Sequence, residues 1–244
     1  MRHSLLFLLF LPLLTRNALA QSSRSYDDLL VLYVDENYEK CIFKAERYTE
    51  RDATRRDPLP YLYMSMCFHE ISKMDKYTDD PDFKNAGRDA LKYAEKFRKK
   101  DKENAYFAQY EDYWEELNAA AMGVGFMYLE EGSYSKAKRE FDRMTGYDPE
   151  NAGAWLMLAL SQMKMNLMRD AEESLVQFRH TYAKMGDHDR LSPDRKRLLR
   201  EALIRYAEQL DNKGMRDSAR TTLALGAEDF MDNAEFKALH DELN

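Results

Sequence analysis

The chain has 244 residues, of which 44% are hydrophobic and 33% are charged, and its formal net charge is −7. It contains four Val and three Ile but 14 Met, and it is rich in Leu, Ala, Glu and Lys. Because β-branched residues favour strands and these other residues favour helices, the composition predicts an all-α protein and excludes sandwiches, barrels and doubly wound sheets. The hydrophobic fraction also excludes a disordered chain.

The N-terminus has the three parts of a secretory signal peptide. Arg2 and His3 form a basic start, residues 5–14 are apolar, and Ala18-Leu19-Ala20 is a cleavage site before Gln21. Ten apolar residues are too few to span a bilayer, which takes about 20. We therefore predict that residues 1–20 are removed and that residues 21–244 form one exported chain, periplasmic or secreted, without membrane insertion.

The charge of the mature chain argues against a nucleic-acid partner. Removal of the signal peptide takes away Arg2 and Arg16 and no acidic residue, so the net charge changes from −7 to −9. Nucleic acid binding requires clustered Lys and Arg. The one basic run, residues 96–102, lies at the C-terminal end of a predicted helix, where cations suit the helix dipole. A solvated helix end is therefore favoured over a binding patch.

Two irregular helix pairs are predicted before residue 100, at about residues 26–55 and 59–99. The second pair contains an insertion at residues 74–82, which includes a proline. Cys41 and Cys67 are the only cysteines, and both lie in apolar helical stretches. Buried free thiols are favoured, although an exported chain permits a disulfide.

The next segment, residues 105–117, carries a stripe of large apolar side chains at helical spacing. Its members are Tyr106, Phe107, Tyr110, Tyr113, Trp114 and Leu117. An amphipathic helix that packs on its neighbours is favoured over an aromatic ligand platform. Because no helix breaker follows, either one helix spans residues 105–131 or a bend near Asn118 separates two helices.

The middle of the chain repeats at a spacing of 34 residues, in copies at 118–151 and 152–185. Small residues occupy equivalent positions: Gly125 pairs with Ala159, and Ala137 with Ala171. Small side chains allow two antiparallel helices to approach closely. Gly132 can supply the left-handed residue that ends the first helix, and Pro149 ends the second, since the residue before a proline is pushed out of the helical region.

This pattern resembles the tetratricopeptide repeat, a helix–turn–helix unit of 34 residues. Trp155 occupies the large apolar position 4 in the second copy, and Pro149 occupies the proline position in the first, whereas Ala121 is a departure at position 4. The resemblance implies a right-handed superhelical solenoid of antiparallel helix pairs, with a degenerate unit at about 200–233 and a C-terminal capping helix at 234–242.

The resemblance also implies that the first helix of each pair lines a concave face that binds a protein or peptide partner. The predicted groove consists of Met122, Phe126, Leu129, Leu156, Leu160 and Met163. Such an apolar, Met-bearing groove suits an amphipathic helix or an extended apolar segment. Two alternatives stay open: the chain's own insertion or end helices fill the groove, or the same face mediates self-association into a homo-oligomer.

The sequence contains no recognisable catalytic or cofactor motif. His69-Glu70 lacks a second histidine one turn later, so the zinc-protease pattern fails. Gly123-x-Gly125 has no third glycine and no preceding strand, and Asp187-His188-Asp189 reads as a polar loop. We therefore predict a non-catalytic scaffold or adaptor of the cell envelope, with no metal and no cofactor.

Overall fold

The computed structural model describes residues 25–186 and 191–244. The predicted signal peptide and the loop at residues 187–189 lie outside these ranges. Within them, all regular secondary structure is helical, so the all-α prediction is confirmed. None of the helices described is long and apolar enough to cross a membrane.

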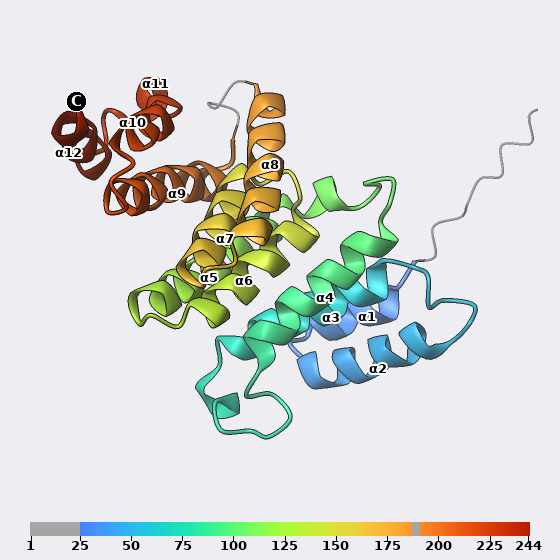
Figure 1. Ribbon diagram of the computed structural model, residues 1–244. Coiled ribbons are helices and arrows are strands. Elements are labelled where there is room, and N and C mark those ends of the chain that lie inside the picture. The colour runs from blue at the N-terminus through green and yellow to red at the C-terminus, as the bar shows by residue number, and fades with distance from the viewer. Residues whose placement is uncertain (1–24, 187–190) are drawn as a thin grey trace, which may run out of the picture.

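Successive helices pack in pairs and stack into a solenoid (Figure 1). The pairs are α1 (Asp27–Val34) with α2 (Tyr38–Glu50), α3 (Leu59–Ser72) with α4 (Ala86–Lys100), α5 (Glu111–Glu130) with α6 (Tyr134–Tyr147), α7 (Ala152–Lys164) with α8 (Met168–Met185), and α9 (Pro193–Asp211) with α10 (Arg216–Ala224). The chain ends in α11 (Ala227–Phe230) and α12 (Ala234–Leu243). Two 3₁₀ helices, η1 (Asp75–Tyr77) and η2 (Phe107–Tyr110), lie in the connections on either side of α4.

A residue with positive φ reverses the chain within four of the five pairs. The residues are Glu36, Gly132, Asn166 and Gly214, with φ between 57° and 74°. In this left-handed conformation the backbone N–H groups after a helix reach back to its last carbonyls, which ends the helix in a defined direction. The same local device therefore sets up successive antiparallel helices.

The connection before α5 differs from these short turns. The buried carboxylate of Asp101 accepts hydrogen bonds from the backbone N–H groups of Ala105 and Phe107, both at 2.9 Å. This contact fixes the backbone of residues 101–107, and a single helix then runs from Glu111 to Glu130. Helix α5 thus begins seven residues before the predicted start of the repeat at 118, and residues 105–110 lie outside it.

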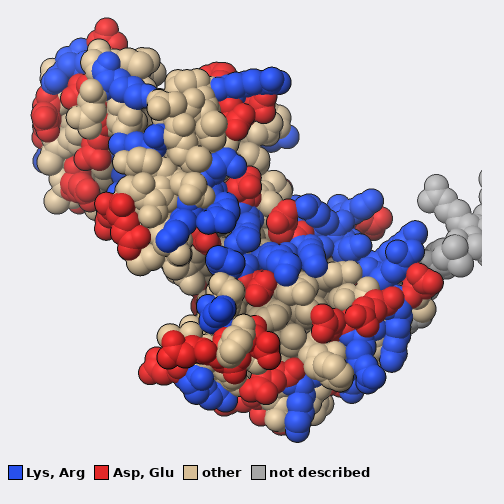
Figure 2. Space-filling model, turned by 60° about the horizontal axis from the view of Figure 1, so that its bottom comes forward, with Lys and Arg blue, Asp and Glu red and all other residues tan. Residues whose placement is uncertain are grey.

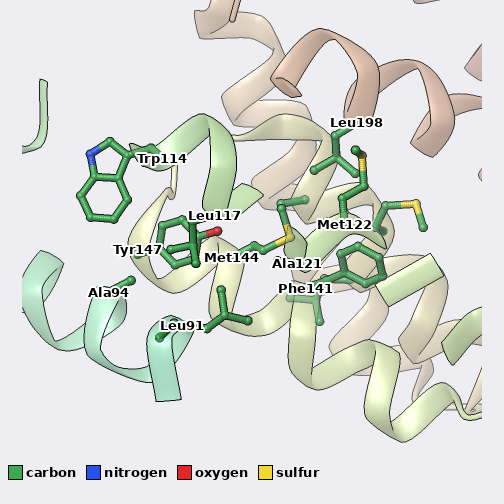
Figure 3. Close-up of a cluster of buried hydrophobic side chains, with 14 of the residues drawn as sticks. Leu91, Ala94, Trp114, Leu117, Ala121, Met122, Phe141, Met144, Tyr147 and Leu198 are labelled. Carbon is green, nitrogen blue, oxygen red and sulfur yellow. The ribbon is translucent and has the colours of Figure 1, made fainter. Parts of the chain in front are cut away.

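The aromatic stripe before residue 118 packs inside the molecule. The indole of Trp114 stacks on Phe107 with ring centroids 4.7 Å apart and on Phe97 at 5.4 Å, and its Nε1 donates to the carbonyl of Phe107 at 2.8 Å. Figure 3 shows Trp114 near Tyr147 of α6, whose ring centroid lies 5.9 Å away. This cluster joins α4, α5 and α6, so the stripe forms core rather than a ligand platform.

The packing order of the helices departs from a regular stack at two places. Helix α4 packs mainly on α6 and contacts α5 only through side chains such as Phe97 on Trp114, and α7 packs on α9 as well as on α6 and α8. Figure 3 shows Leu91 and Ala94 of α4 facing Leu117 and Tyr147. These two departures decide which surfaces remain open.

Cys41 and Cys67 are fully buried free thiols. They lie within hydrogen-bonding reach of each other, and this contact together with burial raises the pKa of Cys67.

Candidate functional site

Most of the six residues of the predicted concave groove are inaccessible. Met122, Leu156, Leu160 and Met163 are at most 5% exposed, and Phe126 and Leu129 are half-buried. Of the alternatives that the sequence leaves open, the structure matches the one in which a later helix of the chain itself fills the groove. The covering element is α9, which packs along α7 and also touches α5.

A close backbone approach fixes α9 on α7. A Cβ atom placed on Gly153 of α7 would lie 2.7 Å from the backbone N of Leu199 and 2.8 Å from the carbonyl carbon of Leu198. Only glycine fits this distance without moving one helix. What remains of the groove is a pocket of about 130 Å³, whose lining includes Leu129, Leu160 and Arg205.

A buried polar network holds the N-terminal end of α9 in place. Arg195 donates two hydrogen bonds to the carboxylate of Asp148, from Nε at 2.9 Å and from Nη2 at 2.5 Å. The neighbouring Asp194 accepts from Nδ2 of Asn118 at 2.7 Å, and Asn118 in turn accepts from the hydroxyl of Tyr147 at 2.6 Å. Burial raises the pKa of Asp148, although Arg195 opposes this shift. These contacts tie α9 to α5 and to the α6–α7 connection.

The repeat-packing residues lie at close helix contacts. Ala137, Ala159 and Ala171 are at most 1% exposed. A Cβ atom on Gly125 would lie 2.6 Å from Cζ of Phe141 across the α5–α6 interface. Trp155 is half-buried, and its Nε1 donates to the carbonyl of Pro149 at 2.9 Å.

An open cleft of about 900 Å³ lies between the α3–α4 pair and the α5–α6 pair. Its walls come from the end of α3, the insertion, the start of α4, and one face of α5. Residues that line it include Met74, Phe83, Leu91, Ala120, Gly123, Val124 and Tyr128. We call this concavity the inter-repeat cleft.

The inter-repeat cleft exists because α4 packs on α6 and leaves α5 unpaired on one side. Ala119, Ala120 and Gly123 are exposed there, and Val124 is 39% exposed. In a regular stack of helix pairs, small and apolar side chains of this kind would contact the preceding pair. The face is therefore apolar, accessible and shaped for close approach of a backbone.

The charges around the inter-repeat cleft are unevenly neutralised. The side chains of Lys84 and Arg88 are exposed and make no hydrogen bond or close ion pair with other described residues, although the charge of Arg88 acts on the carboxyl of Glu140. Lys73, in contrast, donates to Glu70 and Glu116, both at 2.9 Å. The rim beside α4 thus carries two unpaired cations above an apolar floor.

Helix α4 also contributes to a basic band on the surface. Figure 2 shows Lys and Arg gathered across the middle of one face, with Asp and Glu mostly at its borders. The exposed basic residues of the adjoining helices α4 and α6 are Arg88, Lys92, Lys96, Lys99, Lys100, Lys136 and Arg139. Partial burial and the neighbouring Lys92 lower the pKa of Lys96, which indicates local crowding of positive charge.

The insertion at residues 74–82 is apparent from the sequence, but the cleft that it helps to form is not. The one signal in the sequence was the set of small residues between 119 and 125 in α5, of which we assigned Gly125 to helix packing. Whether such residues meet a neighbouring helix or solvent depends on how α4 and α5 are connected, and this is a tertiary property.

One comparison with known proteins identifies the family. The sequence model of the tetratricopeptide repeat matches residues 128–185, which include the C-terminal end of α5, helix α6 and the α7–α8 pair. No curated protein matches the chain. The matched segment contains the second predicted repeat and the whole second helix of the first. Residues 128–185 therefore belong to the tetratricopeptide repeat family.

Proposed function

We propose that this protein is a non-catalytic scaffold or adaptor that binds a segment of a partner protein in the inter-repeat cleft. Tetratricopeptide repeats generally mediate protein–protein interaction. The observation that carries the proposal is the exposed apolar face of α5 opposite two unpaired cations. With α9 over the concave face, the cleft replaces the groove predicted from sequence.

The chemistry of the cleft defines the segment that would fit. Ala120, Gly123 and Val124 offer an apolar wall without long side chains, against which an apolar residue of the partner can pack. Lys84 and Arg88 favour an acidic residue beside it, because charge complementarity steers and orients a partner. The proposed ligand is thus an extended or helical segment with an apolar residue next to Asp or Glu.

Photo-crosslinking at matched positions tests this proposal. A photoreactive amino acid replaces Val124 in the cleft or, as a control, Val176 on α8, which is 48% exposed. We expect position 124 to crosslink one protein that position 176 does not, and Arg88→Glu to reduce the yield at least several-fold. Equal crosslinking at the two positions, or a yield unaffected by Arg88→Glu, would contradict the proposal.

Self-association is the alternative outcome of the same experiment. If position 124 crosslinks to a second copy of this chain, and light scattering shows a concentration-dependent dimer, the protein is a homo-oligomer. The surface that the sequence suggested for a homo-oligomer is mostly buried, and only Phe126 and Leu129 of it are half-exposed. Phe126→Glu then distinguishes the two surfaces: it weakens a dimer that forms through Phe126 and Leu129, and it leaves a dimer that forms through the inter-repeat cleft unchanged.

The cellular setting remains part of the proposal. Residues 1–20 favour export, which places the partner in the cell envelope, in the periplasm or among secreted proteins. N-terminal sequencing of the protein recovered from cells tests this point. We expect a chain that begins at Gln21, and an N-terminus at Met1 would contradict export by signal cleavage.

A further inference from the structure

At one end of the inter-repeat cleft, three side chains that commonly ligate metals converge from two helices. His69 and Glu70 lie in the last turn of α3, and Glu116 lies on α5. One ligand atom from each side chain lies within 4.8 Å of the others.

His69 points into this cluster without a hydrogen bond from its Nε2. The residue is only 3% exposed, and among the described residues its Nε2 has no hydrogen-bond partner. That atom lies 3.6 Å from Oε2 of Glu116, and the ring meets Tyr113 edge to face at 5.9 Å. Since buried polar atoms are nearly always paired, an unpaired imidazole nitrogen beside carboxylates needs an explanation.

Lys73 marks where a cation fits between the two carboxylates. Its ammonium lies 2.9 Å from Oε1 of Glu70 and 2.9 Å from Oε2 of Glu116. The lysine side chain is 44% exposed, so it can turn into solvent without leaving a buried cavity. The ammonium bonds only the two carboxylates, and Nε2 of His69 stays without a hydrogen-bond partner among the described residues.

We propose that His69, Glu70 and Glu116 form a binding site for a divalent transition metal, best matched by Zn²⁺, which displaces the ammonium of Lys73. Bonds of about 2.1 Å in a tetrahedral site place ligand atoms about 3.4 Å apart. The contact between His69 and Glu116 is already 3.6 Å. Glu70 and Glu116 are partly exposed, so small rotations of their side chains bring the third ligand atom into range.

The donor set selects the class of ion. One imidazole nitrogen with two carboxylates suits Zn²⁺ and related transition metals, whereas Mg²⁺ and Ca²⁺ prefer oxygen ligands alone. Three protein ligands leave a further coordination position for water or another ligand. The bound ion would link α3 to α5 across the end of the cleft.

Calorimetric titration of the full chain, without a polyhistidine tag, with ZnCl₂ tests the proposal. We expect one Zn²⁺ per chain and little heat from MgCl₂ or CaCl₂. Glu116→Gln and His69→Gln are each expected to weaken zinc binding at least about tenfold. Lys73→Gln removes the competing ammonium, so this variant is expected to bind Zn²⁺ more tightly than the unsubstituted chain.

Two histidine variants serve as controls. His180→Gln alters an exposed histidine on α8, and His188→Gln alters one outside the described residues; neither is expected to change the affinity. If His69→Gln folds poorly, Glu116→Gln still tests the proposal. The side chain of Glu116 is 60% exposed, so its replacement is not expected to disturb folding. Zinc affinity that is unchanged in Glu116→Gln, or that is lost in His188→Gln, would overturn the proposal.

Discussion

Two glycines of α5, only two positions apart, have opposite surroundings. A Cβ atom on Gly123 meets nothing within 4 Å, because this position faces the inter-repeat cleft. A Cβ atom on Gly125 meets the ring of Phe141, which is fully buried and has no room to move. The same residue type thus marks an open surface at one position and a tight contact at the other.

These glycines provide a matched pair of substitutions. Gly123→Ala is expected to stabilise the protein by up to about 1 kcal/mol, because alanine restricts the unfolded chain and favours helix. Gly125→Ala is expected to destabilise it by about 1–3 kcal/mol through overpacking against Phe141. Urea unfolding measures both changes. An equal gain in stability for the two variants would show that α5 and α6 are not in close contact at this point.

Glu140, a buried carboxyl at the edge of the cleft, gives a pH-dependent prediction. It is 4% exposed, and burial raises its pKa above the ordinary value of 4.5, against the influence of Arg143, Arg88 and Arg139. The folded protein then holds this proton more tightly than the unfolded chain does. The contribution of Glu140 to the free energy of unfolding therefore falls as the pH rises from the ordinary pKa of the unfolded chain to the raised pKa of the folded protein. The fall is at most about 1.4 kcal/mol per pH unit.

Glu140→Gln removes this titration while nearly keeping the shape of the side chain. The variant is expected to gain stability relative to the unsubstituted protein at pH 7 and to gain less at pH 4. Urea unfolding at the two pH values measures the difference. A gain that is the same at both values would mean that Glu140 does not titrate abnormally.

At the scale of elements, one buried ion pair contributes to the position of α9. Asp148 is 1% exposed and relies on Arg195, 47 residues further along the chain. Arg195→Met leaves that carboxylate buried without its partner and is expected to destabilise the protein by about 3–5 kcal/mol. Arg169→Met is the control, because Arg169 forms an exposed pair with Glu173 and its loss is expected to cost less than about 1 kcal/mol. Similar midpoints of urea unfolding for the two variants would contradict the role given to Arg195.

The contrast between α7 and α9 shows how far local sequence reasoning reaches. The start of α7 follows from Asn151, whose side chain accepts from the N–H of Ala154, and from Asp148-Pro149 before it. Both signals lie within a few residues of the helix start that they determine. The docking of α9, in contrast, depends on pairs such as Asp148 with Arg195, which no local pattern reveals.

The candidate sites likewise combine local features, which the sequence reveals, with tertiary features, which it does not. The apolar residues of the predicted groove are a local pattern, and the sequence analysis found them, but their accessibility depends on a later helix. Likewise, His69-Glu70 lacks a second histidine one turn on, so the sequence argued against a metal. The further ligand in our proposal, Glu116, comes from α5 and lies beside them only because of the way the pairs stack.

At the scale of the whole molecule, stability is expected to decline from the middle toward the ends. Helix α7 packs extensively on α6, α8 and α9, whereas α1 packs mainly on α2 and α3, and α12 mainly on α9 and α10. Local opening requires loss of fewer contacts at the ends. Amide hydrogen exchange measured by mass spectrometry should therefore be slowest in α7 and fastest in α1 and α12. Uniform protection from α1 to α12 would instead indicate a single cooperative unit.

The covering of α7 by α9 also matters while the chain is being synthesised. Leu156, Leu160 and Met163 leave the ribosome well before the end of α9 at Asp211. At about 5–20 residues per second, the interval is roughly 2–10 s. During that time the nascent chain presents an uncovered apolar strip, which a chaperone that recognises unfolded segments can bind until α9 arrives.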